Sequence, residues 1–544
     1  LGVAALLAVT CVVGLLPAGV AVCRLTSEAV VRQGRSRWPI STVPLQRRSH
    51  MLRAKAAAES SGASTEAQTA DLIRFIVPTL AALLSSEVMS VVDTAVVGSC
   101  SATELAALGP ATMLVDSSAY LFFWLNVATT SLFATALAAG DQNEAFSTLS
   151  DALYVALLCG LGVSVFIACL GPATLQLICA SALEVVPAAT RYLRIRMFGY
   201  PAFLVGLVLQ AACLGAKDSL SPLLVLLVCG ALNLGLDLVL VRSCGMGIGG
   251  AAIATLAAQL LQTALLAYVV QRKKRRGVAA AAAVATSASP VLASQGPQWL
   301  LLRGRPSLPR IRTFLAFAGP MALVLMGKIA CYNSMTLAAS TGVASLAAHQ
   351  VLNSIFFVGC KYGDAISQTS QAFLPACFPS GAATGLQGSG SPTKASTAVL
   401  PPAAARRLSR RLLRLSISMG AFVSTAAYLV TTRLSTLFTS DVSVTAQVLR
   451  CASLLFVALL LHPPTMASEG LLIGSLEVRF LAKSYAANVA IFLTALYVVS
   501  KRQLGLLAVW ATLAMFQLVR LGTFTMRLKR TRLAFAGAGV KDDN

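Results

Sequence analysis

The sequence predicts an all-α polytopic membrane protein with twelve transmembrane helices arranged as two six-helix lobes. Composition is the first observation, because 57% of the residues are hydrophobic, 12% are charged and the mean hydropathy is +0.77. Typical soluble domains are about 45–50% apolar and about 25% charged. The other two observations are a series of uncharged windows long enough to cross a bilayer and a weak internal repeat that divides the chain into halves.

The transmembrane segments follow from uncharged windows of about 20 residues, the length that an α-helix needs to cross the hydrocarbon core. The predicted spans, in chain order, are 72–97, 105–138, 147–171, 186–214, 219–242, 248–271, 313–340, 345–377, 412–433, 443–470, 475–500 and 504–526. The second and the eighth are longer than a bilayer requires, which leaves room for a bend in each.

The basic residues are concentrated in loops on one side of this arrangement. Lysine and arginine cluster in 272–312, in 394–414 and in the tail, whereas the loops at 98–104 and 340–345 contain neither. Cytoplasmic loops of membrane proteins carry an excess of Lys and Arg. Both termini are therefore predicted on the cytoplasmic side or its topological equivalent. The formal net charge of +23 needs no nucleic-acid partner to explain it.

The soluble segments divide the chain into domains. We expect a targeting or disordered segment at 1–70, an N-lobe at 71–271, a basic flexible connector at 272–312, a C-lobe at 313–528 and a tail at 529–544. A Gly/Ser/Pro-rich insertion at 379–404 interrupts the C-lobe, and its composition is typical of a flexible loop.

The N-terminal segment has the character of a targeting sequence. Residues 1–23 are apolar and uncharged, and residues 24–58 are rich in arginine with a single acid. This order is typical of a signal peptide followed by a transit peptide, which would direct the chain to a plastid through the secretory route. An incomplete N-terminus and an additional helix are the alternatives.

Short matches recur in the same order in the two halves. They are FIVP at 75–78 with FAGP at 317–320, LAA at 105–107 with LAA at 346–348, LGAKD at 214–218 with IGSLE at 473–477, and ATLA at 254–257 with ATLA at 511–514. Two repeats in one orientation imply two lobes around an axis along the membrane normal, with a cavity between them. This architecture suits alternating access better than it suits a receptor or an intramembrane enzyme.

Seven stretches carry a family resemblance. They are VVDTAVVG at 91–98, LAALGPA at 105–111, YLRIRMFGYPAFLVGLVLQAACLGAKDSLSPL at 192–223, LNLGLDLVLV at 232–241, GIGGAAIATLAAQ at 247–259, LAAHQVLNSIFF at 346–357 and SEGLLIGSLEVRFLA at 468–482. In their order and spacing they resemble the multidrug and toxic compound extrusion (MATE) transporters, in particular the DinF-like branch that includes plant plastid members. The resemblance implies two six-helix lobes forming a V, and export of organic compounds driven by inward flow of protons or sodium ions.

The chain departs from this family pattern in three places. The loop between the eighth and ninth helices carries the 379–404 insertion. The seventh helix has Lys328 and lacks the acid found there in some members, and the tenth has Glu469 where DinF-like proteins often show Asp. These differences put a C-lobe cation site in doubt and favour the N-lobe.

The resemblance places cation coupling at Asp93 in the first helix and at Asn233 and Asp237 in the fifth. A carboxylate in a membrane helix costs about 2.5–3.5 kcal/mol on insertion scales, so it rarely lies there without a partner or a water-filled cavity. Asn233 and Asp237 are four residues apart and share one helix face. The three side chains suit a proton or Na⁺, and a purely structural polar contact is the alternative.

Other polar side chains in the predicted helices are candidates to line the substrate cavity. They are Glu87, Asp116, Tyr120, Lys328, His349, Gln350, Asn353 and Glu469. Asp116 and Tyr120 share a face of the second helix because they are four residues apart. Helix capping or packing is the alternative for these residues.

The eighth helix is expected to present His349, Gln350 and Asn353 on one polar face toward substrate. Further along it, Lys361 and Asp364 are spaced for an ion pair within the helix. Lys328 is costly unless paired, and Glu469 or Asp364 is its expected partner. If Lys328 faced the cavity, it would disfavour cationic substrates and favour anions.

The remaining patterns exclude other classes of function. The sequence has no HExxH or GxSxG motif, and its 13 cysteines include no CxxC and no Cys/His cluster. The loop AAGDQNEAF at 138–146 lacks the basic residues of a major-facilitator transporter. We therefore expect that the protein is not an enzyme and has no cofactor. The coupling ion is expected to be H⁺ or Na⁺, and no other metal ion is expected.

The expected function is export of small organic compounds by a cation-coupled antiporter with alternating access. A flippase-like transporter of a lipid-linked or anionic substrate is the alternative. The expected partners are a small organic substrate and the lipid bilayer, with the chain acting as a monomer. A plastid membrane is the expected location, with the plasma or vacuolar membrane as alternatives.

Overall fold

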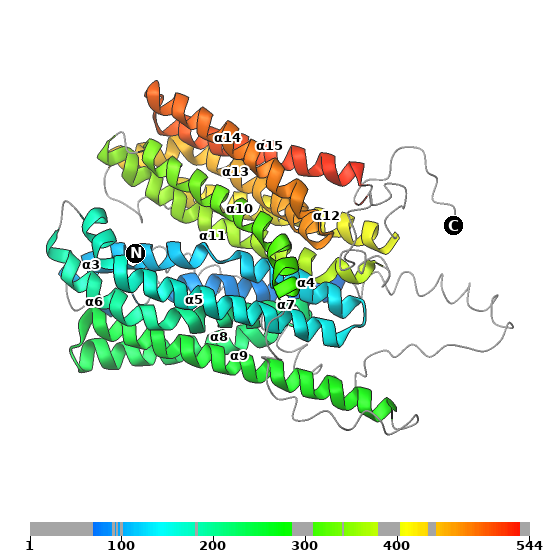
Figure 1. The fold of residues 1–544 in the computed structure, drawn as a ribbon. Helices are drawn as coiled ribbons and strands as arrows, with labels where there is room; N and C mark the ends of the chain where they lie inside the picture. Colours follow the sequence, from blue (N-terminus) through cyan, green and yellow to red (C-terminus); the bar gives the residue numbers. More distant parts are fainter. Residues whose placement is uncertain are drawn as a thin grey trace.

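The computed structural model describes residues 69–89, 93, 96–97, 102–179, 183–285, 308–339, 342–378, 403–433, 442–531 and 533. Over these residues the chain is helical, without a strand. The helices form two elongated bundles that lie side by side (Figure 1). The predicted targeting segment up to 68 and the insertion at 379–402 lie outside the described residues, as does 286–307 of the predicted connector.

The first bundle is the N-lobe. It contains the helix Thr69–Met89, α3 (Ala102–Tyr120), α4 (Trp124–Ala138), α5 (Gln142–Ile178), α6 (Val186–Arg196), α7 (Tyr200–Gly215), α8 (Leu220–Asp237) and α9 (Gly247–Ala285). Short turns link some of them: η1 (Leu183–Val185), η2 (Met197–Gly199) and the wider π-type turn η3 (Leu238–Ser243). Helix α7 packs between α4, α5 and α9 and so lies at the centre of this lobe.

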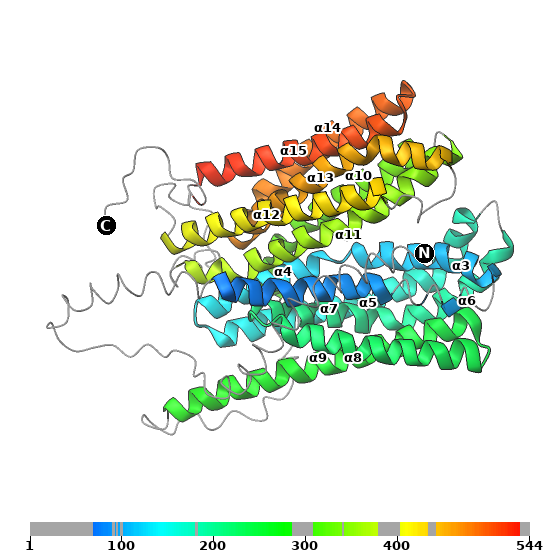
Figure 2. The same cartoon turned by 180° about the vertical axis from the view of Figure 1, so that it is seen from behind.

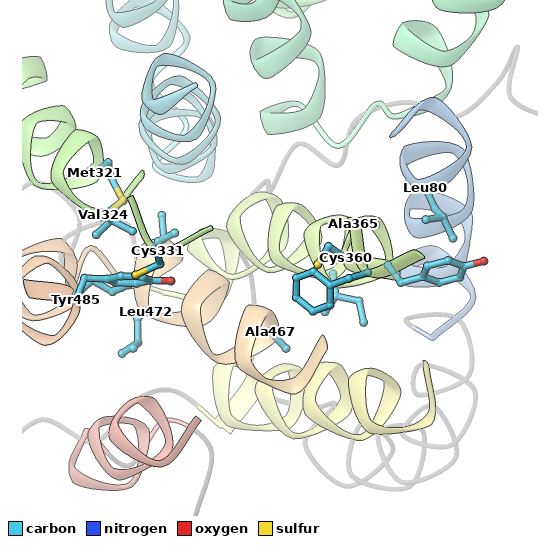
Figure 3. Packing of buried hydrophobic residues seen from close by; sticks show 14 of the residues in the cluster. Leu80, Met321, Val324, Cys331, Cys360, Ala365, Ala467, Leu472 and Tyr485 are labelled. Carbon is cyan, nitrogen blue, oxygen red and sulfur yellow. The ribbon is translucent and has the colours of Figure 1, made fainter. Parts of the chain in front are cut away.

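The second bundle is the C-lobe. It contains α10 (Leu308–Ala339), α11 (Val343–Phe373), the short turn η5 (Pro375–Cys377), α12 (Ala403–Arg433), α13 (Val442–Gly474), α14 (Val478–Lys501) and α15 (Gly505–Arg530). Helix α13 packs against α11, α12 and α15. A Cβ on Gly470 of α13 would lie 2.6 Å from the Ser367 carbonyl oxygen, so a residue without a side chain permits this close approach to α11. Figure 3 shows the resulting core, where Cys360 and Ala365 lie near Ala467.

In the described part of the chain, eleven helical segments are long and apolar enough to cross a bilayer. Helix α11 is not among them although it has 31 residues. Its second half carries Lys361, Asp364, Gln368 and Gln371, which lower its apolarity. Apart from the half-buried Asp364 these side chains are buried, because α11 is enclosed by α12 and α13. The eighth predicted span is therefore a polar helix inside a bundle.

Two of the predicted spans are interrupted near their middle. The second is broken at residues 121–123, between α3 and α4. Its length had left room for a bend. The fourth changes at η2 from α6 to α7. The eighth span does not break, because α11 is continuous from Val343 to Phe373. Both interruptions lie in the N-lobe.

The lobes contact each other at the end that carries the basic segments. Phe75 of the first helix meets Phe373 of α11 edge-on with ring centroids 5.3 Å apart, and the Lys217 ammonium lies 4.8 Å from the centre of the Phe373 ring. Trp124 and Phe314 lie 6.4 Å apart across the same junction. Figure 2 shows that the bundles lie further apart at the opposite end, where α3 and α6 are found. The molecule therefore has the expected V shape.

The internal repeat is visible in the turns. Lys217 and Leu476, which occupy matching places in LGAKD and IGSLE, have φ of 59° and 63°. Gly247 and Gly505, at matching helix starts, have φ of 56° and 78°. These left-handed conformations are uncommon outside glycine, so their recurrence in both halves indicates a shared backbone design.

Candidate functional site

The predicted coupling residues of the N-lobe lie in contact. The Asn233 side chain donates from Nδ2 to Asp93 Oδ1 at 2.7 Å and to Asp237 Oδ2 at 3.0 Å. Asn233 and Asp237 face inward from successive turns of α8 and are 4% and 0% exposed. Asp93 belongs to the segment that follows the helix Thr69–Met89 and is half-buried. One amide therefore joins two carboxylates from separate elements; we refer to these three residues as the acid triad.

The oxygens of the acid triad have few hydrogen-bond donors around them. Oδ1 of Asp237 and Oδ1 of Asn233 are buried and have no hydrogen-bond partner among the described residues. Neither carboxylate forms a salt bridge with a described lysine or arginine. Buried carboxylates are ordinarily paired or hydrogen-bonded, because an uncompensated charge is expensive in an apolar interior. The oxygen donors present would suit a proton or a small hard cation such as Na⁺.

A cavity of about 80 Å³ lies in the N-lobe, and no residue of the acid triad lines it. Its lining comes from α3, α6, α7 and α9 and comprises Val115, Asp116, Ala119, Arg196, Tyr200, Phe203 and Gln259. The Arg196 guanidinium donates from Nη1 to Gln259 Oε1 at 2.8 Å. Tyr120, one turn beyond Asp116 on α3, is 50% exposed and is not part of the lining.

The C-lobe holds its own buried acid in a different way. Glu469 of α13 accepts from Lys328 Nζ at 2.7 Å and from Arg520 Nη2 at 2.8 Å. The Tyr485 hydroxyl donates to the same carboxylate at 2.5 Å, and Arg520 also donates to Tyr485. Arg520 is 0% exposed and Glu469 is 3% exposed. Two cations and a phenol therefore surround one carboxylate; we call these four residues the Glu469 cluster.

The Glu469 cluster continues into a hydrogen-bonded chain. Arg520 Nη1 donates to Gln517 Oε1 at 2.9 Å, and Gln517 Nε2 lies 2.9 Å from His462 Nδ1. Phe356 of α11 packs edge-on against the His462 ring. This chain fixes the position of Arg520 within α15, so the guanidinium is held toward Glu469.

One ion pair crosses between the lobes. Lys361 of α11 donates to Glu87 of the first helix at 2.7 Å. The expected pair between Lys361 and Asp364 is wrong, because the lysine side chain turns across the interface toward Glu87. Asp364 forms no salt bridge with any described residue. The pairing depends on how closely the two lobes approach each other. Residue spacing along one helix cannot predict that approach.

Comparison with known proteins shows which family the chain belongs to. Residues 78–239, which include the acid triad, match the MatE family. The chain is 30% identical over 463 residues to the protein DETOXIFICATION 47, chloroplastic, from Arabidopsis thaliana, covering 85% of this chain and 78% of the relative. The chain belongs to the MATE family. A second Arabidopsis relative, DETOXIFICATION 44, chloroplastic, is 27% identical, with 84% of this chain and 82% of the relative covered.

Solved MATE structures share the fold. A crystal structure of MATE in the bent conformation superposes with a TM-score of 0.70 and 17% identity, covering 85% of this chain and 95% of the other. The protein is accordingly a multi-pass membrane protein of the MATE transporter family. The chloroplast location of both Arabidopsis relatives supports a plastid membrane for this MATE protein.

The three polar residues that helix spacing placed together on α11 differ in burial. His349 is 0% exposed, with Nε2 3.2 Å from Thr336 Oγ1 and its ring 5.8 Å from that of Trp510. Gln350 is exposed and Asn353 is half-buried. His349 therefore packs into the C-lobe of the MATE fold, whereas contact of Gln350 and Asn353 with substrate stays a prediction.

An unpaired lysine in a membrane helix is energetically costly, and Lys328 is paired. Of its two expected partners, the structure shows Glu469 and not Asp364. Its side chain is 15% exposed, and its ammonium also lies 5.5 Å from the centre of the Tyr485 ring. The charge of Lys328 is thus directed at the Glu469 cluster. Glu469 faces the same cluster, so neither residue is placed as a free charge in a cavity.

Sequence reasoning missed Arg520, the arginine that completes the Glu469 cluster of this MATE protein. Arg520 is an isolated arginine inside the predicted span 504–526, whereas Arg196 follows Arg191 and Arg194 inside 186–214. A charge at such a depth is costly, and that cost alone was a signal of function or pairing. The partners Tyr485 and Gln259 carried no comparable signal, because an uncharged polar residue in an apolar helix is common.

Proposed function

We propose that this MATE protein is a secondary transporter that moves small organic compounds out in exchange for H⁺ or Na⁺. The contact that carries the proposal is Asn233 bridging Asp93 and Asp237. Two ionised carboxylates on one neutral amide repel each other, and burial raises that penalty. Uptake of one proton or one small cation removes it. The site would therefore change its charge with the ion gradient.

Exchange would follow from the position of the acid triad between separate elements. Asp93 comes from the first helical segment, and Asn233 and Asp237 come from α8. Loading the triad with an ion would draw these elements together, and unloading would let them separate. A ligand shifts a conformational equilibrium only by its differential affinity for the two states, and this arrangement supplies such a difference. In this proposal the chain acts as a monomer in the bilayer, without a cofactor and without catalytic chemistry.

The test is transport in proteoliposomes with an imposed pH or Na⁺ gradient and a fluorescent organic cation. Asp93→Asn should abolish gradient-driven flux, because the amide no longer gains or loses charge. Asp141→Asn is the matched control, since Asp141 is an exposed N-cap of α5 whose side chain accepts from the Glu144 backbone N–H. The gradient that drives wild-type flux identifies the ion. Undiminished flux in Asp93→Asn would remove the triad from the mechanism.

A second candidate is a flippase-like transporter of a lipid-linked or anionic substrate. The observation that favours it is the positive charge of Arg196 in the N-lobe cavity. The same proteoliposomes decide between the candidates when they are loaded with a fluorescent organic anion. Flux of the anion without flux of the cation would favour this second function.

A further inference from the structure

Helix α12 is longer than a membrane crossing requires. Its 31 residues correspond to a length of about 46 Å, whereas the hydrocarbon core of a bilayer is about 30 Å thick. The stretch from Arg414 to Arg433 spans about 30 Å by itself, and no charged residue lies between these two arginines. With Arg433 at one interface, Arg414 lies at the other. The turns of α12 that precede Arg414 therefore continue into the headgroup region.

These first turns of α12 are rich in arginine. They carry Arg406, Arg407, Arg410, Arg411 and Arg414, and the whole helix contains no Asp or Glu. Arg407, Arg410 and Arg414 are exposed and follow one another at intervals of three and four residues, so they share one helix face. None of the three forms a salt bridge with a described carboxylate. We call these three residues the arginine stripe.

The face that carries the arginine stripe continues along α12 as exposed apolar surface. Ile417 follows Arg414 by three positions and is 56% exposed. Tyr428 and Leu429 lie further along the same face and are 39% and 52% exposed. The opposite face of α12 is buried, because it packs against α11 and α13. Figure 2 shows α12 at the front of the C-lobe. Apolar side chains exposed at bilayer depth contact lipid, so the arginine stripe faces lipid as well.

We propose that the arginine stripe binds the headgroup of an anionic lipid in the leaflet on the basic side of the membrane. Arginine donates two parallel hydrogen bonds to a phosphate and keeps its charge at physiological pH. Basic residues next to a membrane helix attract anionic headgroups. The acyl chains pack along the face that begins at Ile417. A ligand that fits both parts of this face needs a negative headgroup and an apolar tail, which a lipid combines.

The lipid site is separate from the proposed transport function. It lies on the outer face of the C-lobe, and its occupation needs neither an ion gradient nor a transported substrate. The affinity of a single lipid is measured by native mass spectrometry on the detergent-purified full-length protein. The probe is dioleoyl phosphatidylglycerol, and the comparison is dioleoyl phosphatidylcholine, which has the same acyl chains and no net charge.

We expect the first phosphatidylglycerol to bind about tenfold more tightly than phosphatidylcholine. Equal affinities would overturn the assignment. Glycerophosphoglycerol, the same headgroup without acyl chains, distinguishes a lipid from a soluble anion. It should not displace phosphatidylglycerol when both are present at equal concentration. Displacement by this headgroup alone would show a site for a soluble anion and would also overturn the assignment.

A triple variant tests the arginine stripe directly. Arg407→Gln, Arg410→Gln and Arg414→Gln together remove its charge, and each basic residue near an anionic surface contributes about a fivefold effect on binding. Binding of phosphatidylglycerol should therefore weaken about 100-fold, and binding of phosphatidylcholine should not change. Lysine at all three positions should restore part of the affinity, since it keeps the charge and loses the planar fork. Unchanged phosphatidylglycerol binding in the glutamine variant would refute the proposal.

A matched control removes three positive charges from the other end of the C-lobe. Arg433→Gln, Lys501→Gln and Arg502→Gln are substitutions at exposed positions and should leave phosphatidylglycerol binding as in wild type. Equal weakening by both triple variants would mean that net charge alone attracts the lipid, which would overturn a site at α12. The comparison of the two lipids on the wild-type protein decides the headgroup preference even if a variant does not fold. None of these outcomes depends on the flux measured for Asp93→Asn.

Discussion

The two lobes of this MATE protein treat their buried carboxylates in opposite ways. In the N-lobe, Asp93 and Asp237 share a single neutral amide. In the C-lobe, the single carboxylate of Glu469 accepts hydrogen bonds from two cations and from a tyrosine hydroxyl. The two lobes share their turns and helix order. The buried carboxylates of the N-lobe nevertheless form no salt bridge with a described lysine or arginine, whereas the buried carboxylate of the C-lobe forms two. A repeated fold can thus hold one pair of buried acids on a single neutral donor and another buried acid between two cations.

The largest expected effect is on the C-lobe. Glu469→Gln would leave Arg520 buried without a counter-charge and Lys328 without its partner. Removing one partner of a buried ion pair costs about 3–5 kcal/mol. We expect a large fall in the thermal unfolding midpoint of the detergent-solubilised protein. Glu477→Gln is the control, because Glu477 pairs with Arg527 at 2.9 Å in a partly exposed position. Equal midpoints for Glu469→Gln and wild type would show that the cluster contributes nothing to stability.

A smaller effect is expected when the amide of the N-lobe is removed. Asn233→Leu would leave Asp93 and Asp237 without their shared donor. Leaving a buried polar group unsatisfied costs about 1–3 kcal/mol. The unfolding midpoint should fall less than in Glu469→Gln, and gradient-driven flux should be lost. Asn353→Leu in α11 provides the control for the stability measurement alone, since Asn353 is half-buried and is itself a candidate for substrate contact. A larger loss of stability in Asn233→Leu than in Glu469→Gln would reverse the contrast between the lobes.

The smallest expected effect concerns the turn between α7 and α8. Burial alone would raise the pKa of Asp218, but the Lys273 ammonium and hydrogen bonds from Lys273 and Ser221 hold that pKa below its usual value. The pair contributes stability above the unfolded pKa of about 3.9, and the contribution disappears as the pH falls through the lower folded value. Its size is about 0.2–1 kcal/mol, because Lys273 is 41% exposed and solvent screens it.

Unfolding midpoints between pH 7 and pH 3 measure this contribution. Asp218→Asn should be slightly less stable than wild type at pH 7, and the difference should shrink toward the acid end. Lys273→Met should show the same convergence, because it removes the other partner. A stability difference that grows as the pH falls would contradict a lowered pKa for Asp218 in the folded protein.

Much of the fold was predictable from periodicity and charge. Uncharged windows located the spans, and the match of LGAKD with IGSLE indicated the repeat, whose paired left-handed turns at Lys217 and Leu476 only the structure shows. The polar half of α11 was harder to interpret. Residues such as Gln368 and Gln371 weaken a hydropathy signal, while tertiary packing inside the bundle makes their burial possible.

The candidate site was predictable only in part. Spacing placed Asn233 and Asp237 on one face, whereas the approach of Asp93 came from family resemblance and required tertiary structure. Spacing misled for Lys361, whose partner Glu87 lies in the other lobe. Its long side chain can reach a partner on its own helix or on a neighbour, and the sequence does not say which one the fold brings closer.

The Glu469 cluster has a mechanical consequence. Lys328, Glu469, Tyr485 and Arg520 come from four different helices, α10, α13, α14 and α15. Any sliding of these helices against one another would break charge-assisted bonds in an apolar interior. The C-lobe should therefore move as a single rigid lever. Bending would be confined to the N-lobe, where the helices are interrupted at 121–123 and at Met197–Gly199.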